Sequence, residues 1–411
     1  MLAGRVLSVL AHIAFAGSAL GHVSGQGERS SQLEVELAVP TSGSVSELVA
    51  RIKNVGSTDL NLLKFGTILD DKLPIQKVVV LDEAGGEVQA KAIHLSVDYD
   101  ALQSKHFQLL KASESVEAII DAAMVHSFDK SGTYSFVIEG LIPLAVAPST
   151  KLSGPPAYVK SNTVSMYVEA REASFQGSRS IEERTNLDVG GCDGTKYEVI
   201  TAALANCNKL ALAAAADAKD PASVHFVEYF KTNSSATRQT VAERFEAAAE
   251  ECSASDSGVS RLFCYDYYGV CETDDGPLVA YTMWTFNTMV MCPLFYERPP
   301  LPTGCHRQSH ATTVIHETTH CGGVYSPMTQ DYAYGYEECM ALQPDRALLN
   351  AGTYTLYANG DCLSELLMRI PGNPSKEAAH HLVECVGPRP EGACKSVGGW
   401  EVLKLHTSGA D

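Results

Sequence analysis

The sequence predicts an α+β chain in two parts: a β-rich amino-terminal part and a mostly helical carboxy-terminal part with a small antiparallel sheet. Three observations support this division. Residues 27–180 contain short apolar runs with period-two alternation, separated by Gly, Pro, Ser and Asn. From Tyr197 onward, apolar residues recur at helical spacing. All 12 cysteines lie between Cys192 and Cys394, so the two parts are expected to fold separately.

Residues 1–21 have the pattern of a secretory signal peptide. A single early charge, Arg5, precedes the apolar run Val6–Ala19, and the small residues Ala19 and Gly21 stand where signal peptidase accepts them. The run is shorter than the about 20 residues that a membrane-spanning helix needs, and we expect no later segment to span a membrane. The sequence therefore predicts a secreted, extracellular protein.

Composition narrows the range of partners. The 411 residues are 45% hydrophobic, which is enough to bury the cores of two domains. Asp and Glu number 49 against 31 Lys and Arg, so we expect no binding to nucleic acid or to an anionic membrane, and a weak preference for basic polypeptides. An even number of cysteines in an exported chain predicts disulfides. A monomer is the default expectation.

The β-rich part is expected to form a small sandwich, because several short strands are separated by turn residues. One possible helix, residues 112–123, interrupts them. The expected strands are Leu33–Val39, Ser46–Ile52, Val78–Leu81, Tyr134–Ile138 and Val164–Val168.

The carboxy-terminal part is expected to begin with helices that pack on one another as a scaffold. In the last of them, Glu243, Arg244 and Glu246 are expected to form a solvated face. Asn233 begins an Asn-Ser-Ser sequon and is a candidate for glycosylation. The expected helices are residues 197–216, 221–230 and 240–252.

The pattern then changes to strands. Residues 263–268 and 279–284 are rich in aromatic and β-branched residues, and they flank a turn at residues 271–276. The Asp275-Gly276 step in this turn favours a tight hairpin that would pair the two strands. An edge strand of such a sheet can bind an extended polypeptide by strand addition.

The most informative stretch is His316-Glu317-Thr318-Thr319-His320. On a helix, the two histidines lie four residues apart on one face, where one Zn²⁺ can bind both imidazoles at about 2.0–2.1 Å. Glu317 follows the first histidine and lies to the flank of the metal, where a carboxylate can act as a general base.

A catalytic zinc needs a third protein ligand and one open position. A histidine six residues after His320 would be one choice, but that position is Ser326. A glutamate nineteen or twenty residues after His320 would be another, and Glu337 and Glu338 fall slightly short. Asp331, eleven residues on, is the remaining candidate.

Residues 329–335, Thr-Gln-Asp-Tyr-Ala-Tyr-Gly, resemble the G-T-x-D-x-x-Y-G signature of the deuterolysin family, the aspzincin metalloendopeptidases. Met328 stands where the family has glycine. The similarity covers about residues 185–362 and includes three further stretches. These are Cys305-His306-x-Gln308, Val324-Tyr325-Ser326-Pro327 and Tyr354-x-Leu356-Tyr357-Ala358-Asn359.

This resemblance implies a zincin-like fold and a zinc metalloendopeptidase that hydrolyses proteins or peptides. The implied ligands of a single Zn²⁺ are His316, His320 and Asp331, with Glu317 as the general base. Tyr334 would donate a hydrogen bond to the developing oxyanion. The family also favours basic proteins such as protamine and histones. The rival hypothesis is a catalytically inert, zinc-stabilised binding module.

The domain division that follows is a signal peptide (1–21), a β-rich prosegment (22–184), a catalytic domain (185–362) and a carboxy-terminal extension with extra cysteines (363–411). A β-sandwich binding module is the alternative for residues 22–184, but their place before a protease-like domain favours a prosegment. We expect cleavage at or near Arg184-Thr185, although no dibasic pair is present. The prosegment has no cysteine, so it would inhibit by covering the cleft or through His, Asp or Glu.

The resemblance also implies three disulfides, Cys192–Cys264, Cys271–Cys292 and Cys305–Cys362. Cys321 follows a candidate ligand, and we expect it to form a disulfide, with Cys339 as a possible partner, and not to be a fourth ligand. The cysteines whose pairing the sequence leaves open are Cys207, Cys252, Cys321, Cys339, Cys385 and Cys394.

Overall fold

The computed structural model describes residues 32–360, apart from residues 42–44, 153, 155, 171–185, 188–191, 255–256, 267–268 and 272–277. All of these described residues fall within one structural unit, Gln32–Asp411. The expected signal peptide, the junction at Arg184-Thr185 and the extension 363–411 lie outside the described residues.

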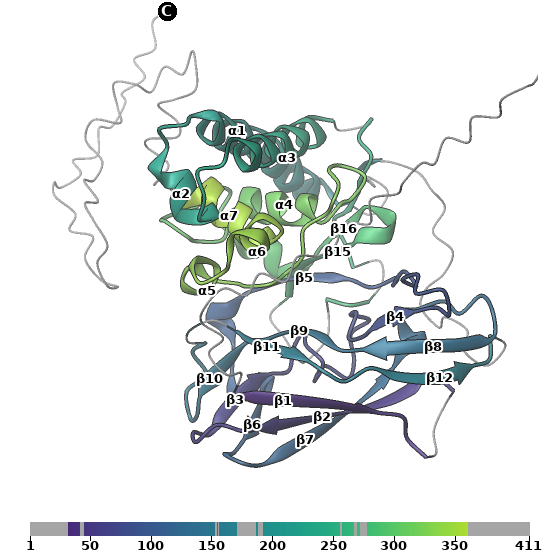
Figure 1. Cartoon of the computed structure of the whole chain (residues 1–411). Helices are drawn as coiled ribbons and strands as arrows, with labels where there is room; N and C mark the ends of the chain where they lie inside the picture. Colours follow the sequence, from purple (N-terminus) through teal and green to yellow (C-terminus); the bar gives the residue numbers. More distant parts are fainter. Residues whose placement is uncertain are drawn as a thin grey trace, which may run out of the picture. The chain divides into compact units, whose positions relative to one another are not determined.

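Residues 32–170, here called the β region, contain four small sheets (Figure 1). In sheet order they are β1 (Leu33–Ala38), β2 (Glu47–Asn54) and β7 (Ser115–Asp121); β10 (Leu144–Val146), β3 (Leu60–Leu63) and β6 (Phe107–Leu110); β11 (Ala157–Lys160) and β9 (Glu139–Ile142); and β12 (Val164–Val168), β8 (Gly132–Val137) and β4 (Val79–Leu81).

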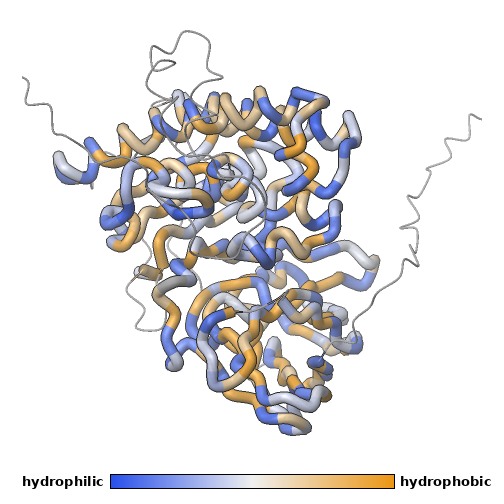
Figure 2. Tube along the Cα trace, turned by 90° about the vertical axis from the view of Figure 1, so that its left-hand side faces the viewer, coloured by the Kyte–Doolittle hydropathy of each residue, from blue (hydrophilic) through white to orange (hydrophobic). Residues whose placement is uncertain are grey.

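Every strand pair in these four sheets is antiparallel, and alternate residues enter one shared apolar core. Along β1 the burial alternates residue by residue, as the sequence Leu-Glu-Val-Glu-Leu-Ala requires. Figure 2 shows hydrophobic and hydrophilic residues alternating along such strands. All five expected strands are present, with ends that differ by a few residues.

The expected helix at residues 112–123 is wrong. Residues 115–121 form β7, which pairs antiparallel with β2. Val116, Ala118 and Ile120 are the more buried side chains of this strand, at a spacing of two. The segment adds to a sheet edge already formed by β2, so tertiary pairing outweighs its local helical pattern.

The remaining described residues, 192–360, are here called the helical region. Its first helices confirm the three expected from the sequence, and Asp193, Ser223 and Ser234 cap them by accepting hydrogen bonds from backbone N–H groups. The helices are α1 (Gly194–Lys219), α2 (Val224–Phe230), α3 (Ser235–Ser253), α4 (His310–Thr319), α5 (Tyr336–Met340), α6 (Pro344–Leu348) and α7 (Ala351–Gly360).

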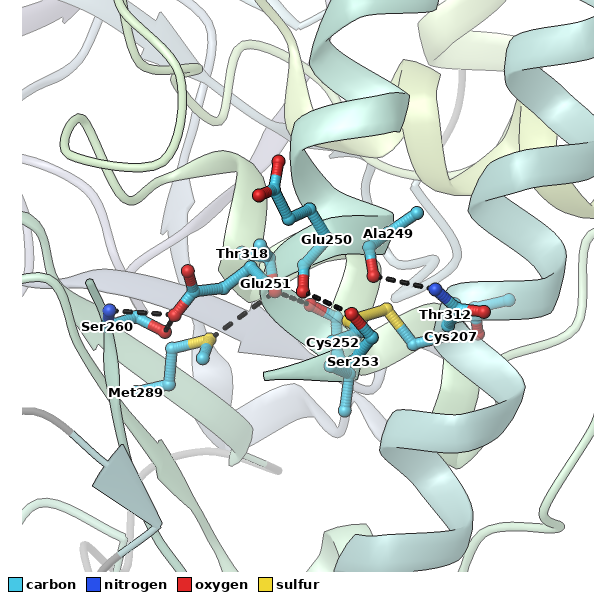
Figure 3. The surroundings of a disulfide bond; sticks show 12 residues. Cys207, Ala249, Glu250, Glu251, Cys252, Ser253, Ser260, Met289, Thr312 and Thr318 are labelled. Carbon is cyan, nitrogen blue, oxygen red and sulfur yellow. Dashed lines mark hydrogen bonds between the residues drawn. A yellow bond between two sulfur atoms is a disulfide. The ribbon is translucent and has the colours of Figure 1, made fainter. Parts of the chain in front are cut away.

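Helix α1 is long and apolar enough to cross a membrane, which the sequence analysis did not anticipate. Its buried residues instead belong to the core that α3, α4 and α7 also line. Cys207 and Cys252, whose pairing the sequence left open, form a disulfide that joins α1 to α3 (Figure 3). Beside it, the Asn208 amide donates to the Ala249 carbonyl of α3. These contacts are those of a core helix.

Arg244 on α3 is a second correction, because it is only 1% exposed. Its guanidinium donates to the backbone carbonyls of Leu348 and Pro327, and it lies over the rings of Tyr325 and Tyr354. Of the three residues expected on a solvated face, only Glu243 and Glu246 are exposed. Arg244 ties α3 to the chain that follows α4.

A five-stranded sheet lies under the helices, with the strand order β13-β14-β16-β15-β5. Its strands from the helical region are β14 (Arg261–Phe263), β15 (Leu278–Met283) and β16 (Thr288–Met291), and β13 (Asn186–Leu187) adds a short edge. The expected strand at residues 263–268 is wrong beyond Phe263, because residues 264–266 form no strand. Its expected pairing with residues 279–284 is wrong as well, because β16 lies between β14 and β15. Residues 272–276 of the expected turn 271–276 lie outside the described residues.

The other edge of this sheet is β5 (His94–Val97), which comes from the β region. It pairs antiparallel with β15, with Thr282 opposite His94 and Tyr281 opposite Leu95. The fold is thus α+β as expected. The small sheet was expected to be antiparallel, which is wrong, because β14 pairs in parallel with β13 and with β16. Its last strand, β5, comes from outside residues 185–362.

Candidate functional site

Helix α4 carries the His-Glu-Thr-Thr-His stretch into the core. Ser309 caps its start, where the Ser309 hydroxyl accepts from the Thr312 amide and the Thr312 hydroxyl accepts from the Ser309 amide. Every residue of the helix is buried. His316 lies in its last turn and His320 is the residue at its end. The local helix that the motif requires is therefore present.

His316, His320 and Asp331 converge on one point. The Nε2 atoms of His316 and His320 are 3.2 Å apart. The Asp331 carboxylate lies 3.2 Å from His316 Nε2 through Oδ1 and 3.3 Å from His320 Nε2 through Oδ2. Donor atoms that bind one Zn²⁺ tetrahedrally at about 2.0–2.1 Å are separated by about 3.3 Å. The spacing of these three side chains therefore fits the metal.

The hydrogen bonding around these groups agrees with metal binding. Both oxygens of Asp331 are buried and have no hydrogen-bond donor among the described residues, although histidine nitrogens lie close to them. His320 Nδ1 is 3.1 Å from the Thr329 carbonyl, so Nδ1 carries the proton and donates. This leaves a lone pair on His320 Nε2, facing the other two groups. His316 Nδ1 is 3.4 Å from the Thr355 hydroxyl.

Electrostatics favours an ionised Asp331. Burial would raise the pKa of this carboxyl, but His320 and His316 beside it outweigh burial and hold the pKa well below its usual range. Burial likewise would lower the pKa of His320, and the Asp331 carboxylate more than offsets it, so the pKa is raised. Negative charge is thus concentrated on Asp331, as a metal-binding carboxylate requires.

Glu317 points from α4 toward the sheet and is fully buried. The Thr282 hydroxyl on β15 donates to Glu317 Oε2 at 2.6 Å, while Oε1 has no partner among the described residues. Burial raises the pKa of Glu317, and the nearby His316 and His320 offset part of that rise. The carboxylate therefore has one anchored oxygen and one oxygen free to take a proton. Sequence reasoning did not identify Thr282.

The Tyr334 ring lies close to the same cluster, with its centroid 6.4 Å from the centroid of the His316 ring. Its hydroxyl donates to the backbone carbonyl of Leu95 on β5 at 3.2 Å. Burial raises the pKa of Tyr334 well above its usual value, so the phenol stays protonated and can donate. The group expected to bind an oxyanion therefore already contacts a carbonyl oxygen of the β region.

The sequence analysis also missed His94, at the start of β5. Its Nδ1 is 3.3 Å from Asp331 Oδ2, and its ring stacks on the His320 ring with centroids 4.2 Å apart. One ligand atom from each of His94, His320 and Asp331 lies within 4.8 Å of the others. Burial lowers the pKa of His94 to about 4. No local pattern marks this histidine.

Two cavities lie along β5. One, of about 610 Å³, is lined by Asp331, Trp284 and Tyr332 together with residues of the β region. The other, of about 290 Å³, is lined by His316, Arg298 and Thr355, and by Val97 of β5. Both include Tyr334, so β5 runs through a groove that passes the candidate ligands.

The cysteine predictions have mixed outcomes. The structure contains the expected pairs Cys192–Cys264 and Cys271–Cys292. Cys305 is disulfide-bonded, and its proposed partner Cys362 lies outside the described residues, as do Cys385 and Cys394.

The expected disulfide between Cys321 and Cys339 is wrong, because both are free, buried thiols. Cys321 Sγ donates to the Glu317 carbonyl on α4, and Cys339 Sγ donates to the Ala333 carbonyl in the following loop. Burial raises the pKa of both thiols, so neither offers a thiolate.

Asn233 is exposed at the start of α3. Its Oδ1 accepts two hydrogen bonds from the buried Arg238 guanidinium. Glycosylation of Asn233 stays a prediction.

The sequence matches the family described as "Deuterolysin metalloprotease (M35) family" over residues 5–368, which includes the β region. A neutral protease 2 homolog of Botryotinia fuckeliana (strain B05.10) is 41% identical over 331 residues, which is 80% of this chain and 90% of that protein. A second one, of Sclerotinia sclerotiorum, is 40% identical over 344 residues, which is 83% of this chain and 92% of that protein. Among solved structures, a zinc peptidase from Grifola frondosa is similar with a TM-score of 0.32 and 21% identity, over 41% of this chain and 96% of that chain.

Proposed function

Because the chain belongs to the deuterolysin metalloprotease (M35) family, we propose that it is a secreted zinc metalloendopeptidase made as a zymogen. His316, His320 and Asp331 would hold one Zn²⁺ per chain. The observation that carries this proposal is the separation of 3.2–3.3 Å among their nitrogen and oxygen atoms in a buried site.

When bound, zinc supplies Lewis-acid chemistry for hydrolysis of the scissile peptide bond. Glu317 accepts the proton of the attacking water at its free oxygen Oε1 and passes it to the leaving amine. Thr282 holds the other oxygen at 2.6 Å and so fixes the direction of the carboxylate. Tyr334 donates from its neutral phenol to the oxyanion that develops on the scissile carbonyl.

The β region is proposed as the prosegment. Its strand β5 pairs with β15, and the Leu95 carbonyl occupies the Tyr334 hydroxyl, so the β region fills the place of a substrate. Cleavage at or near Arg184-Thr185 would free the groove. The disulfides within the helical region fit an oxidising compartment, in agreement with secretion.

The decisive experiment compares Glu317→Gln with a matched control, Glu243→Gln, on the exposed side of α3. Both variants should bind one zinc per chain, and only Glu317→Gln should lose nearly all hydrolysis of casein after removal of the prosegment. Elemental analysis and digestion with and without a chelator measure the two properties. Full activity of Glu317→Gln would exclude Glu317 as the base.

Intact mass of the secreted protein tests the zymogen. A species that begins near Thr185 supports processing, whereas an uncleaved species that digests casein would contradict it. A chain that binds zinc and stays inert after removal of residues 22–184 would instead be the binding module.

The preference for basic substrates is tested with protamine and casein at equal concentration. Residues 185–411, which remain after processing, contain more Asp and Glu than Lys and Arg, and this favours faster hydrolysis of protamine at low salt, with the advantage lost as ionic strength rises. Equal rates at all salt concentrations would refute the preference.

A further inference from the structure

Strand β5 is held in the groove at several points. It forms the edge of the five-stranded sheet, in register from Thr282↔His94 to Ala280↔Ser96, and the register shifts by one residue before Leu278↔Val97. The Gln308 amide donates to the Val97 carbonyl at 3.2 Å. These contacts fix the backbone of β5, so the side chain at its start has a defined position relative to α4.

Beyond β5 the chain is anchored again. Asp98 pairs with Arg298 of the helical region. The Tyr99 ring packs against the Tyr334 ring with centroids 4.7 Å apart. The contacts with the helical region therefore continue beyond the end of β5, at Asp98 and at Tyr99, the first residue of the 3-10 helix Tyr99–Ala101.

The imidazole of His94 lies directly beside two of the proposed ligands, His320 and Asp331. It is packed between the Trp284 ring, with centroids 4.5 Å apart, and the His320 ring, at 4.2 Å. Its side chain is 11% exposed, and Nδ1 approaches the same Asp331 oxygen, Oδ2, that His320 Nε2 approaches. Nδ1 is thus the ring nitrogen that faces the cluster. The other ring nitrogen, Nε2, is buried and has no hydrogen-bond partner among the described residues.

Zinc sites in proteins differ in how many positions the protein fills. A catalytic site has three protein ligands and an open position, whereas a structural site is closed by four. His316, His320 and Asp331 are the three ligands of the proposed enzyme. His94 supplies a further nitrogen, Nδ1, 3.3 Å from Asp331 Oδ2, and one ligand atom from each of His94, His320 and Asp331 lies within 4.8 Å of the others. Because an imidazole lone pair lies in the plane of its ring, the His94 ring must turn out of its stack on His320 to bind the same metal.

We propose that His94 is the fourth zinc ligand of the uncleaved chain, so that the β region closes the catalytic metal site as well as the substrate groove. This inference rests on the proposed function. In the uncleaved chain His94, His316, His320 and Asp331 would together fill the four positions of a closed site. Removal of the β region would take the neutral imidazole of His94 away and leave one position for water or substrate.

The alternative is that His94 only hydrogen-bonds Asp331 and that β5 inhibits by covering the groove. The two explanations differ in the number of histidines bound to the metal. X-ray absorption at the zinc edge counts bound imidazoles, and it does so without any turnover. The uncleaved chain should show three imidazoles, and the processed chain should show two.

Variants in the full chain sharpen this measurement. A Glu317→Gln background keeps the chain from processing itself. In that background, His94→Phe keeps an aromatic ring between Trp284 and His320 but removes the ligand, and the count should fall from three imidazoles to two. Ser96→Ala, on the same strand, is the control and should keep three. Acetohydroxamate, a zinc-binding probe, should bind the uncleaved His94→Phe variant at least tenfold more tightly than the uncleaved parent.

Two imidazoles in the uncleaved wild-type chain, with one zinc bound, would overturn this inference and leave the proposed function standing. This comparison does not depend on whether His94→Phe folds. Failure of the uncleaved and the processed chain to bind zinc would overturn the proposed function, and the inference with it. A count of three that falls to two, both on processing and in His94→Phe, would establish His94 as the ligand.

Discussion

The two walls of the candidate site are built in opposite ways. The helix α4 and the loop after it supply His316, Glu317, His320 and Asp331 from one short stretch of sequence. The facing wall is β5, and the contact between Tyr334 and Leu95 joins residues 239 positions apart. The wall formed by α4 and Asp331, the local wall, is fixed by the helical spacing of its residues and by the short loop between Thr319 and Asp331. A distant wall is held by strand pairing and single side-chain contacts, so one cut in the chain can release it.

The largest effect is expected from breaking the local wall. In the processed chain, Asp331→Ala removes the carboxylate that lies 3.2–3.3 Å from both histidines, and the two remaining imidazoles alone do not form a zinc site of this kind. Zinc content should fall from one per chain to near zero, and activity should be lost with it. Asp345→Ala, at the exposed start of α6, is the control and should keep its zinc. Retention of zinc by Asp331→Ala would remove Asp331 from the ligand set.

A smaller effect is expected where the sheet meets the local wall. Thr282→Val keeps the shape of the side chain but removes the hydroxyl that donates to Glu317. We expect kcat to fall by about 10–100-fold, as for other groups that orient a catalytic side chain, with zinc content unchanged.

The pH profile of Thr282→Val gives a second readout. The Thr282 hydrogen bond lowers the pKa of Glu317, so its loss should raise that pKa. Because Glu317 must be ionised to accept a proton, the acid limb of the kcat profile should move to higher pH. Thr282→Ser should restore both the rate and the profile. An unchanged kcat in Thr282→Val would show that the hydroxyl does not position the base.

The smallest effect is expected from the distant wall. Arg298→Met breaks the ion pair with Asp98. In this pair the Arg298 side chain is 22% exposed and the Asp98 side chain is 12% exposed. The uncleaved chain should lose about 1 kcal/mol of unfolding free energy, as is usual for one partly exposed pair. The processed chain should lose nothing, because Asp98 leaves with the β region. Urea unfolding of both forms measures the difference, and an equal loss in both would show that Arg298 stabilises the helical region by itself.

The sequence predicted those features that depend on local spacing. Alternation along residues 33–39 gave β1, and the two histidines four residues apart gave the buried helix α4. Asp331 was the candidate that remained when the two other ligand spacings failed, and the resemblance also implied it. The structure brings it close to both histidines.

The features that were missed depend on contacts between distant segments. His94 has no pattern around it, and its role appears only when β5 pairs with β15. Arg244 was assigned to a solvated face because it lies between Glu243 and Glu246, whereas the carbonyls that bind it belong to Pro327 and Leu348. A helical wheel cannot show a partner from another part of the chain.

The pairing of β5 with β15 also has a consequence for solubility. All six residues of β15 are buried, including Leu278, Tyr281 and Met283. Loss of β5 would leave this apolar strand with a row of unpaired N–H and C=O groups, which is a template for any extended polypeptide, including a loop of another copy. The edge proposed to bind substrate would then also be the edge at which the processed chain can aggregate or digest itself. The uncleaved chain should therefore be the form that survives concentration and storage.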